Sequence, residues 1–306
     1  MRCVQKIKWK IKDYSRYLTT YHSLAVPDWE GVVLIFDPHL KHPGLLDRFK
    51  AIVGSFELAI KNGREFKILF DPESVLPKYV EPNGINWRID AREVCYSPFH
   101  SRILDYYGEG DIPKLGKARQ YHIYHYVGLD YGLSNGSPDW ESEWSARYNL
   151  LFKPTSYLTR QLSEISWAPG TYIAVHIRFV NALGMLEPDY HQVPLPAEKA
   201  CHLMDTCISK IKELEEESGL PALVFADSPF FLQEAVRRGL HIAPGEVGHI
   251  STHPADLAVW NKAFLDMYII SRAKRVFQIR GDALYASAFS YFSALIGGIH
   301  PEVVIL

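Results

Sequence analysis

The fold class is decided by Gly31-Val-Val-Leu-Ile-Phe36, by the helical pattern that follows from Leu46 to Lys61, and by Phe66-Lys-Ile-Leu-Phe70. The first and last segments are short apolar runs of the kind found in buried parallel strands. Apolar residues recur at helical spacing between them, and Asn62-Gly63 provides a stop signal. A strand, a crossover helix and a second strand form a β-α-β unit, which predicts a doubly wound α/β sheet.

The same alternation returns in the second half of the chain. Strands are expected at Thr171–His176, Pro221–Ala226 and Arg275–Ile279. Helices are expected at Pro196–Glu217, Pro229–Arg238, Ala255–Arg272 and Ala283–Ile296. Between the two halves, the pattern indicates a strand at Tyr121–Val127 and helices at Pro138–Tyr148 and Pro154–Leu162, whereas residues 75–120 allow no assignment.

We therefore predict an α/β protein with two Rossmann-like domains that face each other across a cleft. Domains of about 100–200 residues fit twice into a chain of 306 residues. The expected N-terminal α/β domain spans residues 1–160 and the C-terminal α/β domain residues 161–306, with the boundary before Trp167-Ala-Pro-Gly170.

The composition is that of an ordinary globular protein, with 47% hydrophobic and 22% charged residues. It excludes a disordered tail protein and a collagen-like repeat. With 33 Lys and Arg against 35 Asp and Glu, the net charge of −2 argues against non-specific nucleic-acid binding. No apolar signal segment follows the basic N-terminus and no apolar run reaches about 18 residues, so we expect a cytoplasmic protein without a transmembrane segment.

The four cysteines, Cys3, Cys95, Cys201 and Cys207, are too sparse for a disulfide scaffold and form no C-x-x-C pair. We expect them to be buried small hydrophobic residues in a reducing compartment. Cys201 and Cys207 lie in a predicted helix at a spacing that does not place them on one face.

Three predicted strands are followed by polar residues, and open α/β sheets bind ligands beyond the carboxyl ends of their strands. After the first strand, Gly44 allows a close approach of the backbone. Arg48 and Lys50 lie in the first helical turn, where cations are disfavoured unless an anion binds there. The segment is therefore either an anion site or an ordinary loop with solvated charges.

The other two strand ends are Val175-His-Ile-Arg178 and the segment before Asp227. His176 and Arg178 lie on the same side of their strand, and an arginine can bind phosphate through two hydrogen bonds. His176 could equally be a core histidine. Asp227 suits hydrogen bonds from a base or ribose, or an N-cap on the helix that Pro229 opens. No Asp-x-Asp, G-x-G-x-x-G or P-loop motif occurs, which disfavours a metal-dependent sugar-nucleotide site and a dinucleotide site.

The order of these motifs resembles the GDP-fucose-dependent fucosyltransferase superfamily, which includes the nodulation and core α-1,6-, the bacterial α-1,2- and the protein O-fucosyltransferases. Gly44–Lys50 resembles the family's glycine-containing loop, Val175–Arg178 its His-x-Arg strand end, and Phe225–Ser228 its next strand end. Asp266–Arg272 resembles its D-x-x-x-x-S helix, which a strand and a serine-bearing helix start follow.

The resemblance implies an inverting, metal-independent transfer of fucose from GDP-fucose to a glycan acceptor, with no cofactor and no bound metal. Residues 1–160 would form the acceptor side and residues 161–306 would bind the nucleotide sugar. Arg178 would bind the β-phosphate and stabilise the leaving diphosphate. The other implied donor contacts are Gly44 and Arg48 from the opposite domain, His176, Asp227 and Ser228 near the nucleoside, and Ser287 and Ser290 at a phosphate.

The chain departs from the family pattern in three places. Ala288 replaces the second serine of the family's Ser-Ser-Phe-Ser segment, and Phe179 stands where the family has a second arginine. About six extra residues, Arg280–Tyr285, separate the strand from the serine segment. These departures leave open a weaker phosphate site or a different sugar nucleotide.

The general base and the acceptor surface are also left open. Glu187, which follows the Arg178 loop, and Asp47 are candidate bases, and either could be an ordinary surface carboxylate. Aromatic residues gather in the 79–148 region, where Trp87, Trp140 and Trp144 could stack on a sugar or pack in a core.

Two other functions are alternatives to the transferase. Gly132-Leu-Ser-Asn-Gly136 matches the nucleophile elbow of α/β-hydrolases, with Ser134 as the nucleophile and Asp256, Asp266 and His300 available as partners. The preceding strand is not a buried apolar run, which counts against a hydrolase. The second alternative is a non-catalytic protein that binds a nucleotide or a glycan on the same fold.

Overall fold

The computed structural model describes residues 15, 28–37, 42–104, 112–124, 137–184, 192–248, 250 and 256–306. The chain forms two compact units. Unit 1 comprises Met1–His42, Asp47–Ser74 and Pro82–Lys153, and unit 2 comprises Pro43–Leu46, Val75–Glu81 and Pro154–Leu306. A domain boundary at residue 160 stays a prediction.

Unit 1 is built on a parallel four-stranded sheet with the order β2-β1-β5-β4. The strands are β1 (Gly31–Ile35), β2 (Glu65–Leu69), β4 (Ser101–Ile103) and β5 (Gln120–Ile123). The helix α2 (Leu45–Lys61) connects β1 to β2, which confirms the predicted β-α-β unit. Every residue of β1 is buried, and Gly63 follows the helix with a φ of 60°, as the stop signal predicts.

The remaining elements of this part of the chain are short. They are α3 (Leu76–Tyr79), η1 (Ala91–Glu93), α4 (Trp140–Leu151), and the strands β3 (Val80–Pro82) and β6 (Phe152–Pro154), which form a two-stranded sheet. Trp87 and Trp144 are buried in the core, and Trp87 Nε1 donates a hydrogen bond to the carbonyl of Leu151 at 2.8 Å. Of the two alternatives for these tryptophans, packing in a core is therefore the one that the structure supports, because their rings are covered by protein.

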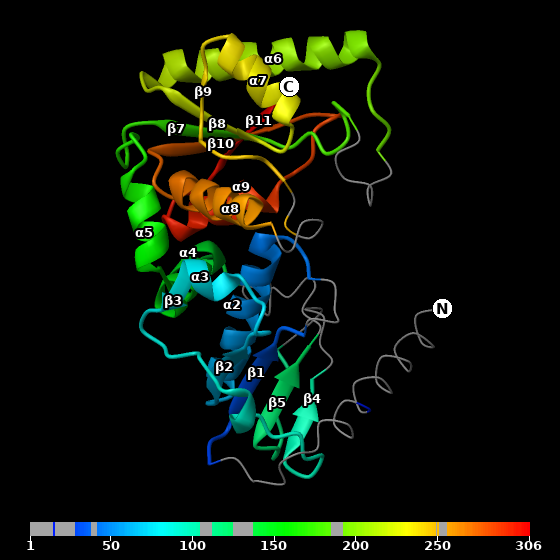
Figure 1. The fold of residues 1–306 in the computed structure, drawn as a ribbon, viewed down its shortest axis with the longest axis vertical. Helices are drawn as coiled ribbons and strands as arrows, with labels where there is room; N and C mark the ends of the chain where they lie inside the picture. Colours follow the sequence, from blue (N-terminus) through cyan, green and yellow to red (C-terminus); the bar gives the residue numbers. More distant parts are fainter. Residues whose placement is uncertain are drawn as a thin grey trace. The chain divides into compact units, whose positions relative to one another are not determined.

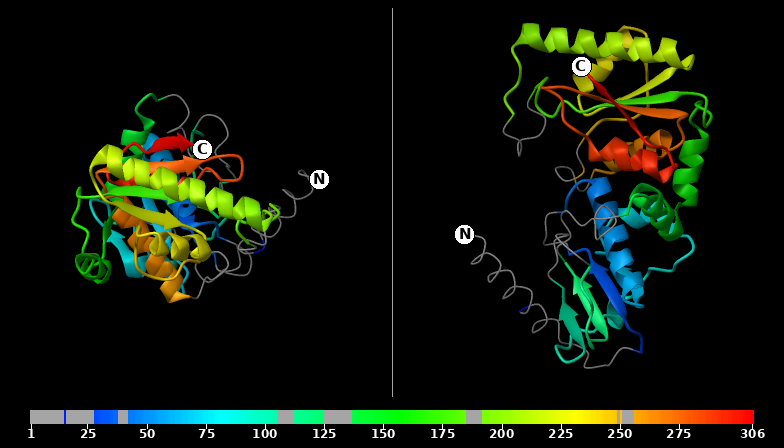
Figure 2. Two further views of the ribbon diagram at one scale, coloured as in Figure 1. Left: turned by 90° about the horizontal axis from the view of Figure 1, so that it is seen from above. Right: turned by 180° about the vertical axis from the view of Figure 1, so that it is seen from behind.

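Unit 2 is built on a parallel five-stranded sheet with the order β11-β10-β7-β8-β9 (Figure 1). The strands are β7 (Ile173–Ile177), β8 (Ala222–Ala226), β9 (His241–Ile242), β10 (Arg275–Arg280) and β11 (Glu302–Ile305). The helices are α5 (Ser156–Ser163), α6 (Ala197–Ser218), α7 (Pro229–Arg237), α8 (Leu257–Ile270) and α9 (Ala288–Ile296). Figures 1 and 2 show α6 and α7 on one face of the sheet and α8 and α9 on the other, so the sheet is covered on both sides.

The helices of unit 2 follow from the sequence pattern, with one correction. The predicted helix from Ala283 begins five residues later, at Ala288. Leu284 N donates to the carbonyl of Gly281 at 3.0 Å, which makes the preceding segment a turn, and Ser287 caps the helix by accepting from Phe289 N at 3.2 Å. The N-cap hydroxyl therefore sets the start of the helix.

The cysteines divide as their helical spacing predicts. Cys207 is buried beneath α6, whereas Cys201 on the same helix is exposed, so the expectation that all cysteines are buried is wrong at Cys201. Cys95 is buried, and Cys3 lies outside the described residues.

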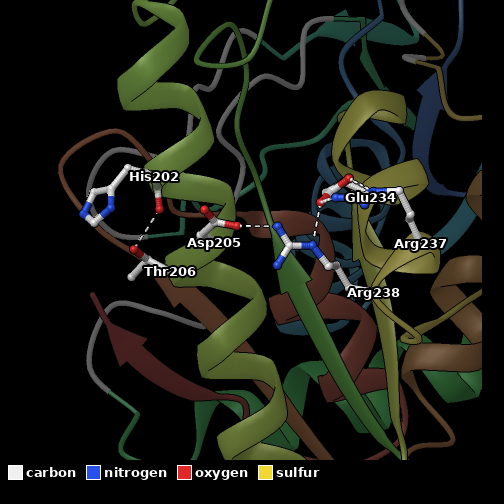
Figure 3. Close-up of polar contacts among 6 residues, drawn as sticks. All are labelled: His202, Asp205, Thr206, Glu234, Arg237 and Arg238. Atoms are coloured by element: carbon white, nitrogen blue, oxygen red, sulfur yellow. Dashed lines mark hydrogen bonds and ion pairs between the residues drawn. The ribbon is translucent and has the colours of Figure 1, made fainter.

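An ion-pair network joins α6 to the end of α7 on the surface of unit 2 (Figure 3). Arg238 contacts Asp205 of α6 and Glu234 of α7, both at 2.7 Å, and Glu234 also contacts Arg237 at 2.6 Å. Among the described helices, none has the length and apolar character that crossing a membrane requires.

Candidate functional site

The strand order of unit 2 indicates a candidate ligand site. From the central strand β7 the chain moves outward to β8 and β9, and it then returns to form β10 and β11 on the other side of β7. The order therefore reverses between β7 and β10. Open α/β sheets bind ligands beyond the carboxyl ends of the strands at such a point.

His176 is the second-last residue of the strand β7, two positions before Arg178, and it is buried. Burial and, to a smaller extent, the neighbouring charge of Arg178 together lower the pKa of its imidazole to about 3. The ring is therefore neutral at physiological pH, with its centroid 6.0 Å from that of Phe289 on α9. This placement fits the core-histidine interpretation, and the nucleoside contact stays a prediction.

The loop after Arg178 is held by Asp227. Its carboxylate oxygens accept hydrogen bonds from Phe179 N and Val180 N, each at 2.8 Å. Val180 has a φ of 55°, which is a strained conformation for a β-branched residue. Asp227 therefore fixes a strained turn directly after the predicted phosphate-binding arginine.

The next residue, Ser228, is the N-cap of α7 and accepts a hydrogen bond from Phe231 N at 3.3 Å. The alternative that Asp227 caps this helix is therefore wrong, because Ser228 does so. Ser228 is buried, and its predicted donor contact stays a prediction.

A buried polar network connects the strand β10 with the start of α9. The amide of Gln278 donates to the carbonyl of Ser287 and to Oγ of Ser290, both at 2.8 Å. Ser290 is fully buried, and the hydroxyl of Ser287 is engaged as the N-cap of α9. Both predicted phosphate contacts stay predictions, and the geometry gives each serine a supporting role around Gln278 and the helix start.

The loops after β7 and β10 are tied to each other. Tyr285 N donates to the carbonyl of Arg178 at 2.8 Å. Gln192 accepts from Asn181 N at 3.4 Å and donates to the carbonyl of Ala283 at 3.2 Å. The two strand ends are therefore positioned as one structural feature.

Sequence reasoning missed Arg280, which it treated only as the start of an inserted segment. Arg280 is the last residue of β10, and its Nη2 donates to Oε1 of Gln278. The sequence signal that could have found it is the arginine directly after a buried strand, as at Arg178.

The site residues predicted at the first strand end surround the start of α2. Gly44 directly precedes this helix, and Asp47 forms an ion pair with Lys50 at 2.6 Å, so the charge of Lys50 is balanced within the helix. Arg48 is buried. The pKa of His42 is lowered by the burial of its own ring and by the nearby charge of Arg48. The role of Gly44, Asp47 and Arg48 toward a donor stays a prediction.

Two predicted residues lie outside the described part of the chain, the candidate base Glu187 and the candidate nucleophile Ser134. Two of the proposed hydrolase partners have structural roles. Asp256 caps α8 by accepting from Ala258 N at 2.9 Å, and Asp266 pairs with Lys262 at 2.6 Å. The hydrolase alternative is therefore not favoured.

Solved structures resemble this fold along most of the chain. A mutant of Arabidopsis thaliana FUT1 in complex with GDP matches with a TM-score of 0.56 and 16% identity, over 96% of this chain and 74% of that chain. The chain has the fold of a fucosyltransferase. NodZ α-1,6-fucosyltransferase soaked with GDP-fucose matches with a TM-score of 0.56 and 16% identity, over 87% of this chain and 92% of that chain.

NodZ from Bradyrhizobium shares this fucosyltransferase fold, with a TM-score of 0.55 and 14% identity over 87% of this chain and 93% of that chain. No protein-family model and no curated protein sequence matches the chain. The resemblance predicted from short motifs is thus confirmed at the level of the fold. The fold is shared although the sequence identity is only 14–16%.

Proposed function

We propose that the chain is a glycosyltransferase of the GDP-fucose-dependent superfamily, which transfers fucose from GDP-fucose to a glycan acceptor. The observation that carries the proposal is the fold shared with a fucosyltransferase solved with GDP, over 96% of this chain. The site supports it independently, because Arg178 lies at the point where the strand order reverses.

In the proposed reaction, the oxygen of an acceptor hydroxyl attacks the anomeric carbon of fucose, and the bond from that carbon to the β-phosphate oxygen breaks. GDP leaves with the bonding electrons, and the hydroxyl proton goes to a base, for which Glu187 and Asp47 are candidates. A single displacement of this kind inverts the anomeric configuration. Arg178 would stabilise the charge that develops on the diphosphate without a metal ion.

Each further residue has a supporting role in this proposal. Asp227 fixes the loop that follows Arg178, and the neutral ring of His176 lies near Phe289 of α9. The Ser287-capped start of α9 adds a positive dipole end on the same side of the sheet. A GT-B arrangement, in which Gly44 and Arg48 close over the pyrophosphate, belongs to the same proposal.

The first test is a titration with GDP, UDP, CDP, GDP-fucose and GDP-mannose, in which the shift of the melting temperature is measured. We expect stabilisation by the guanine nucleotides alone, growing with ligand as RT ln(1 + [L]/Kd). Stabilisation by UDP in place of GDP would remove the fucose assignment. No response to any nucleotide would contradict the transferase.

The second test measures chemistry. Release of GDP from GDP-fucose is followed over an array of glycan acceptors, with and without a metal chelator, and proton NMR records the anomeric configuration of the product. Binding of GDP-fucose without turnover on any acceptor would instead indicate a non-catalytic binding protein.

A further inference from the structure

Arg280 and Arg178 lie side by side at the carboxyl edge of the sheet in unit 2. The strands β10 and β7 are parallel neighbours whose register pairs Gln278 with His176 and Ile279 with Ile177. Arg280 follows Ile279 in β10, and Arg178 directly follows Ile177 at the end of β7, so the same register places the two arginines next to each other. Adjacent strands are about 4.8 Å apart, so the two arginines start from neighbouring backbone positions.

Both arginines belong to the same face of the sheet. Side chains alternate along a strand, so Arg178 shares its face with His176 and Arg280 shares its face with Gln278. That face is covered by α9, because His176 packs near Phe289 and Gln278 bonds to Ser290. Two guanidinium groups therefore leave the sheet on the side where α9 begins.

The Arg280 guanidinium is positioned by a built network. The Gln278 amide nitrogen is held by Ser287 and Ser290, which leaves its Oε1 to accept from Nη2 of Arg280. The Nε atom of Arg280 is buried without an acceptor, and Arg280 forms no ion pair with any described residue. A partly buried cation without a counter-charge favours an anionic ligand.

The residue that follows Arg178 cannot provide this charge. Phe179 is fully buried, and its ring centroid lies 4.8 Å from that of Phe231 on α7, on the opposite face of the sheet. A second phosphate-binding cation must therefore come from another strand end, and β10 supplies one.

We propose that Arg280 binds the diphosphate of the nucleotide together with Arg178, as a second phosphate-binding residue of the same site. The ligand class is a nucleoside diphosphate or its sugar ester. This inference rests on the proposed function for the identity of the base, whereas the arginine pair itself concerns only the phosphates.

The test compares Arg280→Met with Arg275→Met by isothermal titration calorimetry. Arg275 is the matched control because it begins the same strand and pairs with Glu302, far along β10 from the site. The ligands are GDP, UDP, GMP, guanosine and inorganic pyrophosphate. We expect Arg280→Met to weaken GDP binding at least tenfold and guanosine binding less than twofold, and Arg275→Met to change neither.

Unchanged GDP affinity in Arg280→Met would overturn the proposal while the transferase assignment stands. An equal loss for guanosine would also overturn it, because the effect would then be structural. Binding of UDP and pyrophosphate in place of GDP would remove the guanine assignment, and the Arg280 comparison would then be made with those ligands. Binding of no diphosphate by the wild-type protein would overturn both proposals.

Arg280→Lys keeps the assay decisive if Arg280→Met fails to fold. Lysine restores the charge but not the two-pronged geometry of arginine. We expect GDP affinity between those of wild type and the Met variant, with a melting temperature close to wild type. If Arg280→Lys binds GDP as tightly as wild type, and if added salt does not weaken this binding, a charge contact between residue 280 and the diphosphate is contradicted.

Discussion

Arg178 is held by its main chain independently of its guanidinium, since its carbonyl accepts a hydrogen bond from Tyr285 N. Arg178→Ala therefore removes a charge and keeps the loop. We expect GDP affinity to fall tenfold or more and transfer from GDP-fucose to be lost, because a charge-assisted bond to phosphate contributes about 1.5–3 kcal/mol. Calorimetry and a transfer assay measure both.

The control for this variant is Arg237→Ala, which changes an exposed arginine of the α7 surface network. It should leave GDP affinity and transfer unchanged. Wild-type affinity in Arg178→Ala would contradict the placement of the phosphate site at the end of β7.

A candidate site residue can be named from the sequence where it directly follows a strand in the chain. Arg178 directly follows β7, so the pattern marks it as a candidate, and its contact with phosphate stays a prediction. The function of Asp227 could not be read in this way, because its partners Phe179 and Val180 lie 48 and 47 positions away. The sequence shows that Arg280 follows an apolar strand, but only the strand order shows that β10 is the neighbour of β7 and that Arg280 lies beside Arg178.

At the scale of the element, the turn after β7 depends on one carboxylate. Asp227→Ala leaves Phe179 N and Val180 N without their acceptor and leaves the strained Val180 turn unsupported. We expect the free energy of unfolding to fall by about 2–4 kcal/mol, as measured by urea denaturation.

Asp205→Ala is the control for the turn, because it removes an equally small carboxylate from an exposed ion pair with Arg238 (Figure 3). Exposed pairs contribute little, so this variant should unfold near the wild-type urea midpoint. Similar midpoints for both variants would show that Asp227 is not what holds the turn.

Elements were predicted well where burial and periodicity agree, as in β1, α2 and β7. The start of α9 was missed because the segment from Gly281 to Ser287 carries no glycine or proline close to the true cap, and the apolar spacing continues through it. The strands β9 and β11 were missed because they are short and partly exposed, so no apolar run marks them.

At the scale of the whole molecule, alternating strands and helices were enough to predict an α/β fold with parallel sheets. The alternation does not contain the order of the strands. That order depends on which face of the sheet each crossover helix covers. It is therefore set by the packing of the two helical layers against the sheet. The edge at which we propose that the nucleotide binds is therefore defined only in the assembled sheet.

Acid should destabilise both units through buried histidines. Burial lowers the pKa of His122 in β5 and of His176 in β7 to about 3, against 6.5 for an ordinary histidine. Below about pH 6.5 these histidines therefore bind protons in the unfolded chain but not in the folded protein. The free energy of unfolding therefore falls as the pH falls toward 3. The loss should reach about 2 kcal/mol per histidine at pH 5.

Between about pH 6.5 and 5, carboxylates with a lowered pKa, such as Glu234 at about 2, still carry their charge, and a histidine variant compared with wild type gives the contribution of one ring. His122→Asn removes one of the two groups and keeps a polar partner for Gln120, whose Oε1 lies 3.1 Å from His122 Nε2. The variant should lose about 2 kcal/mol less than wild type between pH 7.5 and pH 5 in urea unfolding. An equal loss in both proteins would mean that His122 already takes up a proton in the folded state, and that burial does not hold its ring neutral.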